Sequence, residues 1–368
     1  MHFVSSIARG NTHDRKRIPM SRDITVGGNL VTDSASAYVI AEIGHNHGGD
    51  VEKAAELIRM AAESGASAAK LQKRDNKALF TKAMYDEPYT GRNSFGPTYG
   101  AHREAVEFGV AEYQQLASLS RDLGIDFFAT AFDLPSVDFL AELGMPAIKI
   151  ASGDLTNTPL LTYAAKTGIP LIVSTGGADM DEVRRAVDTV APINDQLALL
   201  QCTAAYPATP DVLNLSVINT YREEFPDVVV GLSGHDIETE SSVIAYALGA
   251  RVIEKHVTMD RTLPGSDHHF SLEAGHLREL VDSLDRTRRS LGSPEKRQLP
   301  VEAPALRKMA KKIVAARDLS AGHVLTAEDI AIKSPGDGLR PYLIDQVLGR
   351  PLLAPLAADG AVQFDNLG

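Results

Sequence analysis

The chain has 368 residues, of which 44% are hydrophobic, 23% charged and 6% aromatic, and its formal net charge is −11. This composition is typical of a folded protein of two or three domains, and it excludes a disordered, collagen-like or disulfide-framework protein. The acidic balance argues against a nucleic-acid partner, and the sequence has no apolar run of about 18 residues that would predict a membrane span.

The N-terminal segment before Tyr38 lacks the apolar core of a signal peptide. We interpret residues 1–28 as a polar tail, within which Met20 is a second candidate start of the chain. The single cysteine, Cys202, has no partner for an internal disulfide and is expected to be a buried small hydrophobe rather than a nucleophile. These features together predict a reducing, cytoplasmic location.

From Tyr38 onward, a short apolar run followed by an amphipathic stretch repeats eight times. In the first unit, residues 38–42 are typical of a buried strand, and Asp50 is a residue type that caps a helix. Ala54, Leu57, Ile58 and Ala61 then have the spacing of one helix face. The later strands are predicted at residues 68–72, 126–131, 147–151, 171–174, 197–202, 228–232 and 251–256. The later helices are predicted at residues 111–123, 135–143, 159–166, 181–190, 215–224, 240–248 and 273–291.

Eight such units within residues 29–292 favour a closed (β/α)8 (TIM) barrel, with an open doubly wound sheet as the alternative. No GxGxxG motif follows the first strand, which disfavours a dinucleotide-binding fold. Residues 73–109 are too many for a simple loop, and on a barrel they would lie over the catalytic mouth. Residues 293–311 read as a linker, and residues 312–368 as a small β-rich module that is marginally stable alone.

In a TIM barrel, chemistry takes place at the carboxyl ends of the strands, and two lysines interrupt apolar strands at these positions. Lys70 and Lys149 both face the predicted barrel interior, where a lone ammonium is costly to bury. A bound phosphate or carboxylate would compensate both charges, with neutral donors from Thr130, Ser152 and Ser174 beside them. The alternative is that each lysine pairs with Glu42 or Glu254.

Two histidines at the ends of neighbouring strands, His235 and His256, are candidate ligands of one divalent ion. A pair of histidines predicts a metal only weakly, because most such pairs bind nothing. His45 and His47 flank Asn46 in a Gly-rich turn after the first strand, where simple turn packing is equally open.

The motifs together resemble the N-acetylneuraminate (sialic acid) synthase family, with its C-terminal SAF (antifreeze-like) domain. In the barrel, the matching stretches are Ala41-Glu-Ile-Gly-His-Asn-His-Gly48, Ala69-Lys-Leu-Gln72, Ile148-Lys-Ile-Ala-Ser-Gly153, Val173-Ser-Thr-Gly176, Cys202-Thr-Ala-Ala-Tyr-Pro207, Gly231-Leu-Ser-Gly-His235 and Ile253-Glu-Lys-His256. In the C-terminal module, they are Ala315-Ala-Arg-Asp-Leu and Lys333-Ser-Pro-Gly-Asp-Gly338.

The resemblance implies an enzyme that condenses phosphoenolpyruvate with the open-chain aldehyde of an N-acetylmannosamine-type sugar, giving a nonulosonic acid and phosphate. It implies a phosphoenolpyruvate site and a divalent ion, with manganese expected and magnesium or cobalt as alternatives. It also implies a homodimer in which the SAF domain of one chain caps the barrel of its partner.

Carried over by position, the resemblance assigns roles to twelve residues. The phosphoenolpyruvate site is made of Lys70, Thr130, Lys149, Ser152 and Ser174, and the ion is held by His235 and His256. The sugar contacts and proton-handling groups are Glu42, Gln72, Tyr206, Glu254 and Asp267. Of these, we expect Glu42, then Asp267, to move protons, and Lys70 and Lys149 to act at the reacting phosphoenolpyruvate.

Two positions depart from the family pattern and leave the acceptor sugar open. Ala204 stands where the family often has Asn, so one side-chain contact to phosphoenolpyruvate is missing. Ser334 stands where the family often has Arg in the SAF domain. A legionaminate-type synthase is therefore one alternative, and a class I pyruvate aldolase with a Schiff-base lysine is a second. A non-catalytic binder of sugar acids is a third.

Overall fold

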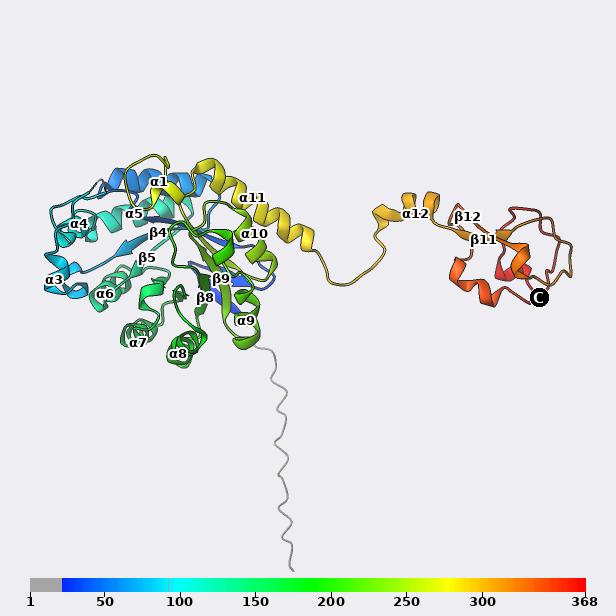
Figure 1. Ribbon diagram of the computed structural model, residues 1–368, viewed down its shortest axis with the longest axis horizontal. Coiled ribbons are helices and arrows are strands. Elements are labelled where there is room, and N and C mark those ends of the chain that lie inside the picture. The colour runs from blue at the N-terminus through cyan, green and yellow to red at the C-terminus, as the bar shows by residue number, and fades with distance from the viewer. Residues whose placement is uncertain (1–21, 92) are drawn as a thin grey trace, which may run out of the picture. The chain divides into compact units, whose positions relative to one another are not determined.

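The computed structural model describes residues 22–91 and 93–368, and the chain divides into two compact units, Met1–Gly292 and Ser293–Gly368 (Figure 1). Eight parallel strands of the first unit close into a barrel in the order β10-β3-β4-β5-β6-β7-β8-β9. They are β3 (Tyr38–Gly44), β4 (Ala68–Lys73), β5 (Asp126–Ala131), β6 (Ile148–Ile150), β7 (Leu171–Ser174), β8 (Leu197–Cys202), β9 (Val229–Gly234) and β10 (Val252–His256). The pairing of β10 with β3, which brings His256 opposite Glu42, closes the sheet and confirms the barrel over the open-sheet alternative.

Helices cover the outside of the barrel, one after each strand (Figure 1). They are α1 (Val51–Glu63), α5 (Val110–Leu123), α6 (Leu134–Glu142), α7 (Thr158–Lys166), α8 (Met180–Val190), α9 (Val217–Glu224), α10 (Glu240–Ala247) and α11 (Ala274–Leu291). In α1, the Asp50 side chain accepts from the backbone N–H groups of Glu52 and Lys53, as its N-cap position predicts. The apolar faces of these helices and the strands form one continuous core.

A hairpin of β1 (Asp23–Val26) and β2 (Asn29–Thr32) precedes the barrel, so the expected polar tail is wrong for residues 23–28. The alternation of Ile24 and Val26 with polar residues is the pattern of a half-buried strand, and both side chains are fully buried in the barrel core. Asn29 donates to the carboxylate of Asp126 at the start of β5, which places the hairpin at the amino-terminal end of the barrel. Residues 1–21 of the expected tail lie outside the described residues.

The long segment between β4 and α5 contains three short helices, α2 (Asn76–Leu79), α3 (Lys82–Tyr85) and α4 (Tyr99–Glu104). Phe80, Tyr99 and Arg103 of this segment line the cavity at the carboxyl ends of the strands. The prediction that residues 73–109 border the barrel mouth is therefore confirmed for these side chains.

The second unit has its own small core around Ile313, Val347 and Val362. Its strands β11 (Lys312–Ala315) and β12 (Ile330–Lys333) pair antiparallel, and α12 (Ala303–Met309) lies within the segment expected as a linker. The buried Asp329 carboxylate accepts from His323, Arg317 and the Thr326 backbone and hydroxyl. The contacts with His323 and Thr326 hold its pKa well below the usual range. A charged network thus supplements a core that is small for a folded unit.

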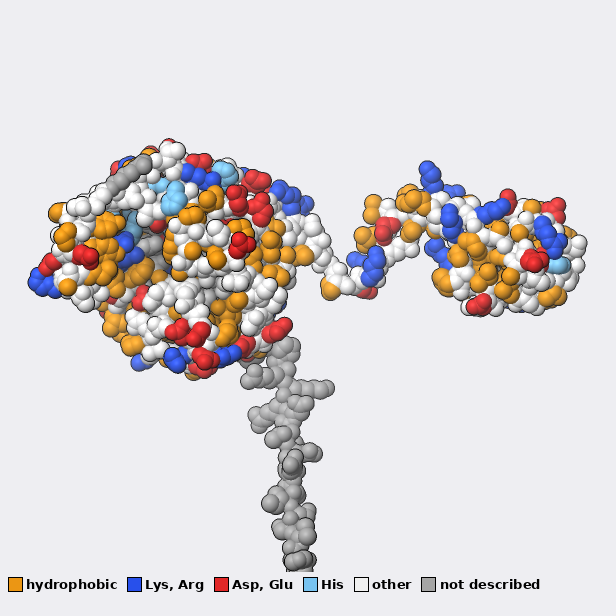
Figure 2. All heavy atoms as spheres, in the orientation of Figure 1, with side chains coloured by type: hydrophobic (Ala, Val, Ile, Leu, Met, Phe, Trp, Pro, Cys, Tyr) orange, Lys and Arg blue, Asp and Glu red, His pale blue; other side chains and the backbone are white. Residues whose placement is uncertain are grey.

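Acidic and basic side chains are interspersed on the visible face of both units (Figure 2). Among the described residues, no helix combines the length and the apolar character that crossing a membrane requires.

Candidate active site

A cavity of about 760 Å³ lies at the carboxyl ends of the barrel strands. All twelve residues proposed from the sequence line it: Glu42, Lys70, Gln72, Thr130, Lys149, Ser152, Ser174, Tyr206, His235, Glu254, His256 and Asp267. The strand geometry explains why they meet, because alternate residues of a strand face the same side. Lys70 and Gln72 of β4 therefore share a face, as do Glu254 and His256 of β10.

The two interior lysines each contact a carboxylate. The Lys70 Nζ lies 2.6 Å from Glu42 Oε2 and 3.8 Å from Glu254 Oε2, and it donates to the Thr130 hydroxyl at 2.8 Å. The Lys149 Nζ lies 3.9 Å from Glu254 Oε1 and donates to the Ser174 hydroxyl at 2.6 Å. These pairs match the alternative in which the lysines compensate Glu42 and Glu254, while both ammonium groups still line the cavity.

Burial and proximity drive the pKa values of the two carboxylates apart. Burial raises the pKa of Glu42, although the neighbouring Lys70 opposes the shift. Burial also acts to raise the pKa of Glu254, but Lys149 and Lys70 outweigh it, so its pKa is lowered. Two nearby carboxyl groups with opposite shifts are the arrangement that separates a proton donor from a permanent anion.

One corner of the cavity, after strands β6, β7 and β8, is closely packed. The Gly176 N–H donates to the Ser152 hydroxyl at 2.9 Å. A Cβ at Gly176 would come within 2.9 Å of that oxygen and 3.1 Å of the Cys202 Sγ, so only glycine permits this close approach. With Lys149 and Ser174 beside it, this corner presents hydroxyl and ammonium donors to a compact anion.

Three polar side chains converge on Gly44, at the end of β3. A Cβ at this position would lie 3.4 Å from Glu42 Oε1 and Gln72 Nε2 and 3.5 Å from Asp267 Oδ2. The Gln72 amide donates to Glu42 Oε1 at 2.7 Å. Acceptors and donors are thus grouped where hydroxyl groups of a polyol would meet them.

The histidine pair meets the requirements for holding a divalent ion. The centroids of the His235 and His256 rings lie 5.5 Å apart. The His235 Nδ1 lies 2.9 Å from the Thr203 carbonyl oxygen, so this nitrogen donates and Nε2 keeps its lone pair. The His256 Nδ1 is buried without a hydrogen-bond partner in the structure, and burial lowers the pKa of this ring, which keeps it neutral.

No third side chain completes such a set. Among the residues that the structure describes, no group of three His, Cys, Asp or Glu is arranged to hold a metal ion. The two histidines therefore fit an ion whose remaining ligands are oxygens of substrate or water.

The tyrosine predicted to contact substrate packs against His235, one member of this pair. The Tyr206 ring centroid lies 4.1 Å from that of His235. Burial is the main cause that raises the pKa of Tyr206 to about 12, so its hydroxyl remains a donor at neutral pH. Asp267 Oδ2 lies 3.8 Å from His256 Nδ1, on the same side of the cavity.

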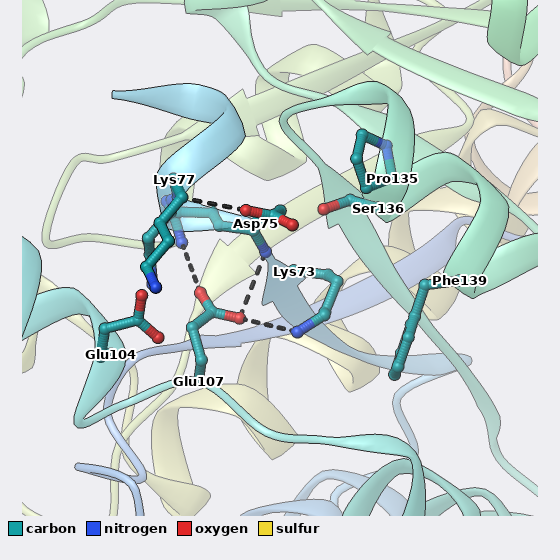
Figure 3. Close-up of a pocket in the computed structure, with 10 residues that line it drawn as sticks. Lys73, Asp75, Lys77, Glu104, Glu107, Pro135, Ser136 and Phe139 are labelled. Carbon is teal, nitrogen blue, oxygen red and sulfur yellow. Dashed lines mark hydrogen bonds and ion pairs between the residues drawn. The ribbon is translucent and has the colours of Figure 1, made fainter. Parts of the chain in front are cut away.

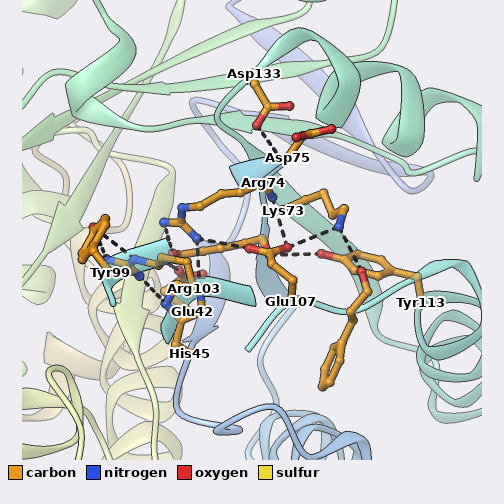
Figure 4. A network of polar contacts seen from close by, with 12 residues as sticks. Glu42, His45, Lys73, Arg74, Asp75, Tyr99, Arg103, Glu107, Tyr113 and Asp133 are labelled. Atoms are coloured by element: carbon orange, nitrogen blue, oxygen red, sulfur yellow. Dashed lines mark hydrogen bonds and ion pairs between the residues drawn. The ribbon is translucent and has the colours of Figure 1, made fainter. Parts of the chain in front are cut away.

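Sequence reasoning missed several cavity residues. Arg74 follows β4, and Tyr99 and Arg103 belong to α4, where no periodic pattern marks a functional face. His45, which was left open, lies between Arg74 and Arg103 (Figure 4). The only signal for Arg74 was its position two residues after Gln72, at the carboxyl end of a strand.

His47 and Cys202 have different surroundings from these cavity arginines. The His47 ring is buried against Phe108, with centroids 4.3 Å apart, which supports the turn-packing interpretation for this residue. Cys202 is buried as expected, but its Sγ lies 4.0 Å from His235 Nδ1, a neighbour on the adjacent strand that sequence proximity does not reveal.

Comparison with known proteins gives two family matches. Residues 57–296 match the NeuB family and residues 312–368 match the SAF domain. The chain is 40% identical to N-acetylneuraminate-9-phosphate synthase of Homo sapiens, covering 93% of this chain and 96% of that one. It is 37% identical to N,N'-diacetyllegionaminic acid synthase of Legionella pneumophila, covering 91% and 95%.

A solved structure agrees with this. N-acetylneuraminic acid synthetase from Leptospira borgpetersenii, in complex with citrate, superposes with a TM-score of 0.69 at 34% identity. The match covers 78% of this chain and 96% of that chain.

Proposed function

Because the chain belongs to the NeuB family, we propose that it condenses phosphoenolpyruvate with the open-chain aldehyde of N-acetylmannosamine or a related hexosamine. The products are a nonulosonic (sialic-type) acid and inorganic phosphate. The observation that carries the proposal is the placement of Lys70 and Lys149, with Ser152, Ser174 and Thr130, around one cavity at the barrel mouth.

Phosphoenolpyruvate supplies the anion for the two lysines. Its phosphate and carboxylate have only acceptor oxygens, and the donors of Lys149, Ser174 and the Ser152 corner match them. The Lys70 ammonium sits between Glu42 and Glu254, so it holds the substrate next to Glu42, the proposed proton carrier. This position supports a role for both lysines at the reacting carbon as well as in binding.

The proposed reaction balances with one water. The C2–C3 double bond of phosphoenolpyruvate donates its electron pair to the aldehyde carbon, and the aldehyde oxygen takes a proton to become a hydroxyl. Water adds to the electron-deficient C2 and loses a proton. The C2 hydroxyl then loses its proton as the C2–O bond to phosphate breaks, and the departing phosphate takes up a proton, which leaves the 2-keto acid and inorganic phosphate.

Protein carboxylates handle these protons. We assign Glu42 as the principal proton carrier because burial raises its pKa above that of a free carboxyl group and because it accepts a hydrogen bond from Gln72. Asp267 is the second candidate, and Gln72, Tyr206 and Glu254 orient the sugar hydroxyls. Glu254 remains an anion between the lysines and keeps the site from accumulating excess positive charge.

His235 and His256 would hold a divalent ion, with manganese expected and magnesium or cobalt as alternatives. When bound, such an ion supplies Lewis-acid polarisation of the aldehyde oxygen, worth several kcal/mol. The buried, unpartnered Nδ1 of His256 and the oriented ring of His235 support this assignment.

The domain and assembly proposals follow the same family. We propose a catalytic barrel that begins with the β1–β2 hairpin and ends at Gly292, a linker over 293–311 and an SAF domain over 312–368, acting in the cytoplasm. We further propose a homodimer in which each SAF domain caps the partner's barrel, which the small core of the second unit supports. Light scattering that shows a monomer at working concentration would contradict the dimer.

The relatives leave the acceptor open, since one is an N-acetylneuraminate-9-phosphate synthase and another an N,N'-diacetyllegionaminic acid synthase. A screen of acceptor sugars with phosphoenolpyruvate and manganese tests the function, with phosphate release and product mass as readouts. We expect phosphate release that requires both an aldose and the ion. Borohydride trapping of a Schiff base at Lys149 or Lys70, with pyruvate in place of phosphoenolpyruvate, would instead establish the aldolase alternative.

A further inference from the structure

We propose that Arg74, Arg103 and His45 form a second anion-binding end of the cavity, and that the acceptor sugar carries a phosphate on the carbon farthest from its aldehyde. The inference rests on the proposed function, since it identifies the class of acceptor used at the same site. These three residues are distinct from the twelve already assigned to phosphoenolpyruvate, sugar and ion.

Two arginine N–H groups face the His45 ring, which can accept only one hydrogen bond. Arg74 Nη1 lies 2.9 Å from the His45 Nε2, and Arg103 Nη1 lies 3.1 Å from its Nδ1. A guanidinium group only donates, while a neutral imidazole has a single acceptor nitrogen. Burial, together with the two arginines, holds the pKa of His45 well below its usual range, so the ring is neutral. One arginine therefore faces an N–H group, and an oxygen anion would satisfy it.

The positive charge at this end is only partly compensated. Arg74 has one carboxylate within 4.0 Å, Glu107 at 3.9 Å, and that carboxylate is shared with Lys73 at 3.2 Å. Figure 3 shows the Glu107 carboxylate directed toward the Lys73 ammonium. Within the described part of the chain, Arg103 forms no ion pair, and its Nε and Nη2 donate to the Tyr99 hydroxyl at 3.1 and 2.9 Å. Two guanidinium groups thus border the cavity with a surplus of charge.

A continuous series of contacts connects this end to the reacting end. Arg74 Nη2 donates to Gln72 Oε1 at 2.7 Å, and Gln72 in turn donates to Glu42, which contacts Lys70. Two side chains, Gln72 and Glu42, therefore separate the arginines from the lysine assigned to phosphoenolpyruvate. With the first anion placed at the lysines, the second anion must belong to the other substrate.

The connectivity of the acceptor then decides where its anion sits. The aldehyde carbon must meet C3 of phosphoenolpyruvate, so the opposite end of the open hexose chain extends past Gln72 toward Arg74 and Arg103. A phosphomonoester on the terminal carbon presents three acceptor oxygens, which suit two planar guanidinium groups. The acceptor class is therefore an N-acylated hexosamine phosphate.

The test compares N-acetylmannosamine with its 6-phosphate as acceptors for the full-length protein, with phosphoenolpyruvate and manganese. We expect the wild type to prefer the phosphorylated acceptor by about 100-fold or more in kcat/KM, which corresponds to about 2.7 kcal/mol. Arg103→Gln should bring this ratio close to one, and Arg103→Lys should give an intermediate ratio. Arg121→Gln removes an exposed positive charge on α5 as the matched control and should leave the ratio as it is.

Three results would overturn the proposal. The wild type could show a ratio of the two kcat/KM values near one, or Arg103→Gln could leave that ratio unchanged. Arg103→Gln could also raise the KM for phosphoenolpyruvate equally with both acceptors. The last result would assign the arginines to phosphoenolpyruvate. Calorimetric titration with each sugar alone measures the anion site without turnover, and the phosphorylated sugar should bind more tightly only when Arg103 is present. If phosphoenolpyruvate releases no phosphate with either sugar, the proposed function is refuted. The calorimetric titration still shows whether the arginines bind the phosphorylated sugar.

Discussion

The ammonium of Lys70 lies 2.6 Å from the carboxylate of Glu42, and both side chains are almost fully buried beneath the cavity. The pair joins the proposed phosphoenolpyruvate site to the proposed proton carrier. Glu42 therefore competes with a substrate anion for Lys70. It is also close enough to that substrate to exchange a proton with it. The first prediction separates these two effects.

Replacing Glu42 by glutamine should lower kcat by about 10²–10⁴-fold, the usual contribution of a general acid or base. Phosphoenolpyruvate should bind at least as tightly, because Lys70 loses a competing anion. Stopped assays of phosphate release and calorimetry of phosphoenolpyruvate binding measure the two quantities. Glu56→Gln, on the exposed face of α1, is the control. Undiminished turnover with intact substrate and metal binding would remove Glu42 from this role.

Replacing Lys149 by methionine should weaken phosphoenolpyruvate binding by about 10- to 100-fold, because a charged hydrogen-bond donor contributes roughly 1.5–3 kcal/mol. The Ser174 hydroxyl loses its 2.6 Å partner in the same change. Binding is measured by calorimetry, with the exposed Lys166→Met as the matched control. An unchanged dissociation constant would show that Lys149 serves only to compensate Glu254.

A third buried lysine offers a structural contrast. Lys255 of β10 contacts Asp236 Oδ1 at 2.9 Å and the Glu238 carbonyl at 3.0 Å, and it does not line the active-site cavity. Lys255→Met should lower the free energy of unfolding by roughly 3–5 kcal/mol, because it leaves the Asp236 charge buried and unpaired. Urea unfolding followed by circular dichroism measures this. Adding Asp236→Asn should recover part of the loss, and a cost below about 1 kcal/mol for the single change would refute the argument.

The turn histidine should make the protein sensitive to acid. Burial lowers the pKa of His47 from 6.5 to about 4. Between these pH values the His47 imidazole binds a proton in the unfolded chain but not in the folded chain. The free energy of unfolding therefore falls as pH falls. The loss from this one residue should reach roughly 3 kcal/mol at pH 4. Unfolding measured at pH 7 and pH 4.5 should show a smaller difference in His47→Gln than in the wild type. The exposed His276→Gln serves as the control, and equal pH dependence in all three proteins would contradict the assignment.

Strand periodicity and the positions of strand ends were enough to predict the barrel and most residues of the candidate site. Alternate residues of a strand face the same side, so Lys70 could be grouped with Gln72 on β4, and Glu254 with His256 on β10, from the sequence alone. The turn at Gly176 was likewise predictable, because a Gly-Gly pair follows a buried strand.

Other features depend on contacts between distant segments. Arg103 and His45 are 58 residues apart in the sequence, so their contact could not be predicted from spacing. The helix α4 is also too short for a periodic pattern to mark a functional face. The hairpin before β3 has only four residues in each strand, which is too few for alternation to stand out from a polar segment. The pairing of each lysine with a carboxylate was visible as an alternative, but spacing along the chain does not say which partner lies at 2.6 Å.

The most direct test of the central claim follows the bridging oxygen of phosphoenolpyruvate. The protein is incubated with an aldehyde acceptor, manganese and phosphoenolpyruvate that carries ¹⁸O at the oxygen between C2 and phosphorus. Mass spectrometry then measures the masses of the phosphate and of the sugar acid. Cleavage of the C–O bond predicts that the label leaves with the inorganic phosphate and that the sugar acid carries none. Label retained in the organic product, or phosphate release that does not depend on the acceptor, would contradict the account.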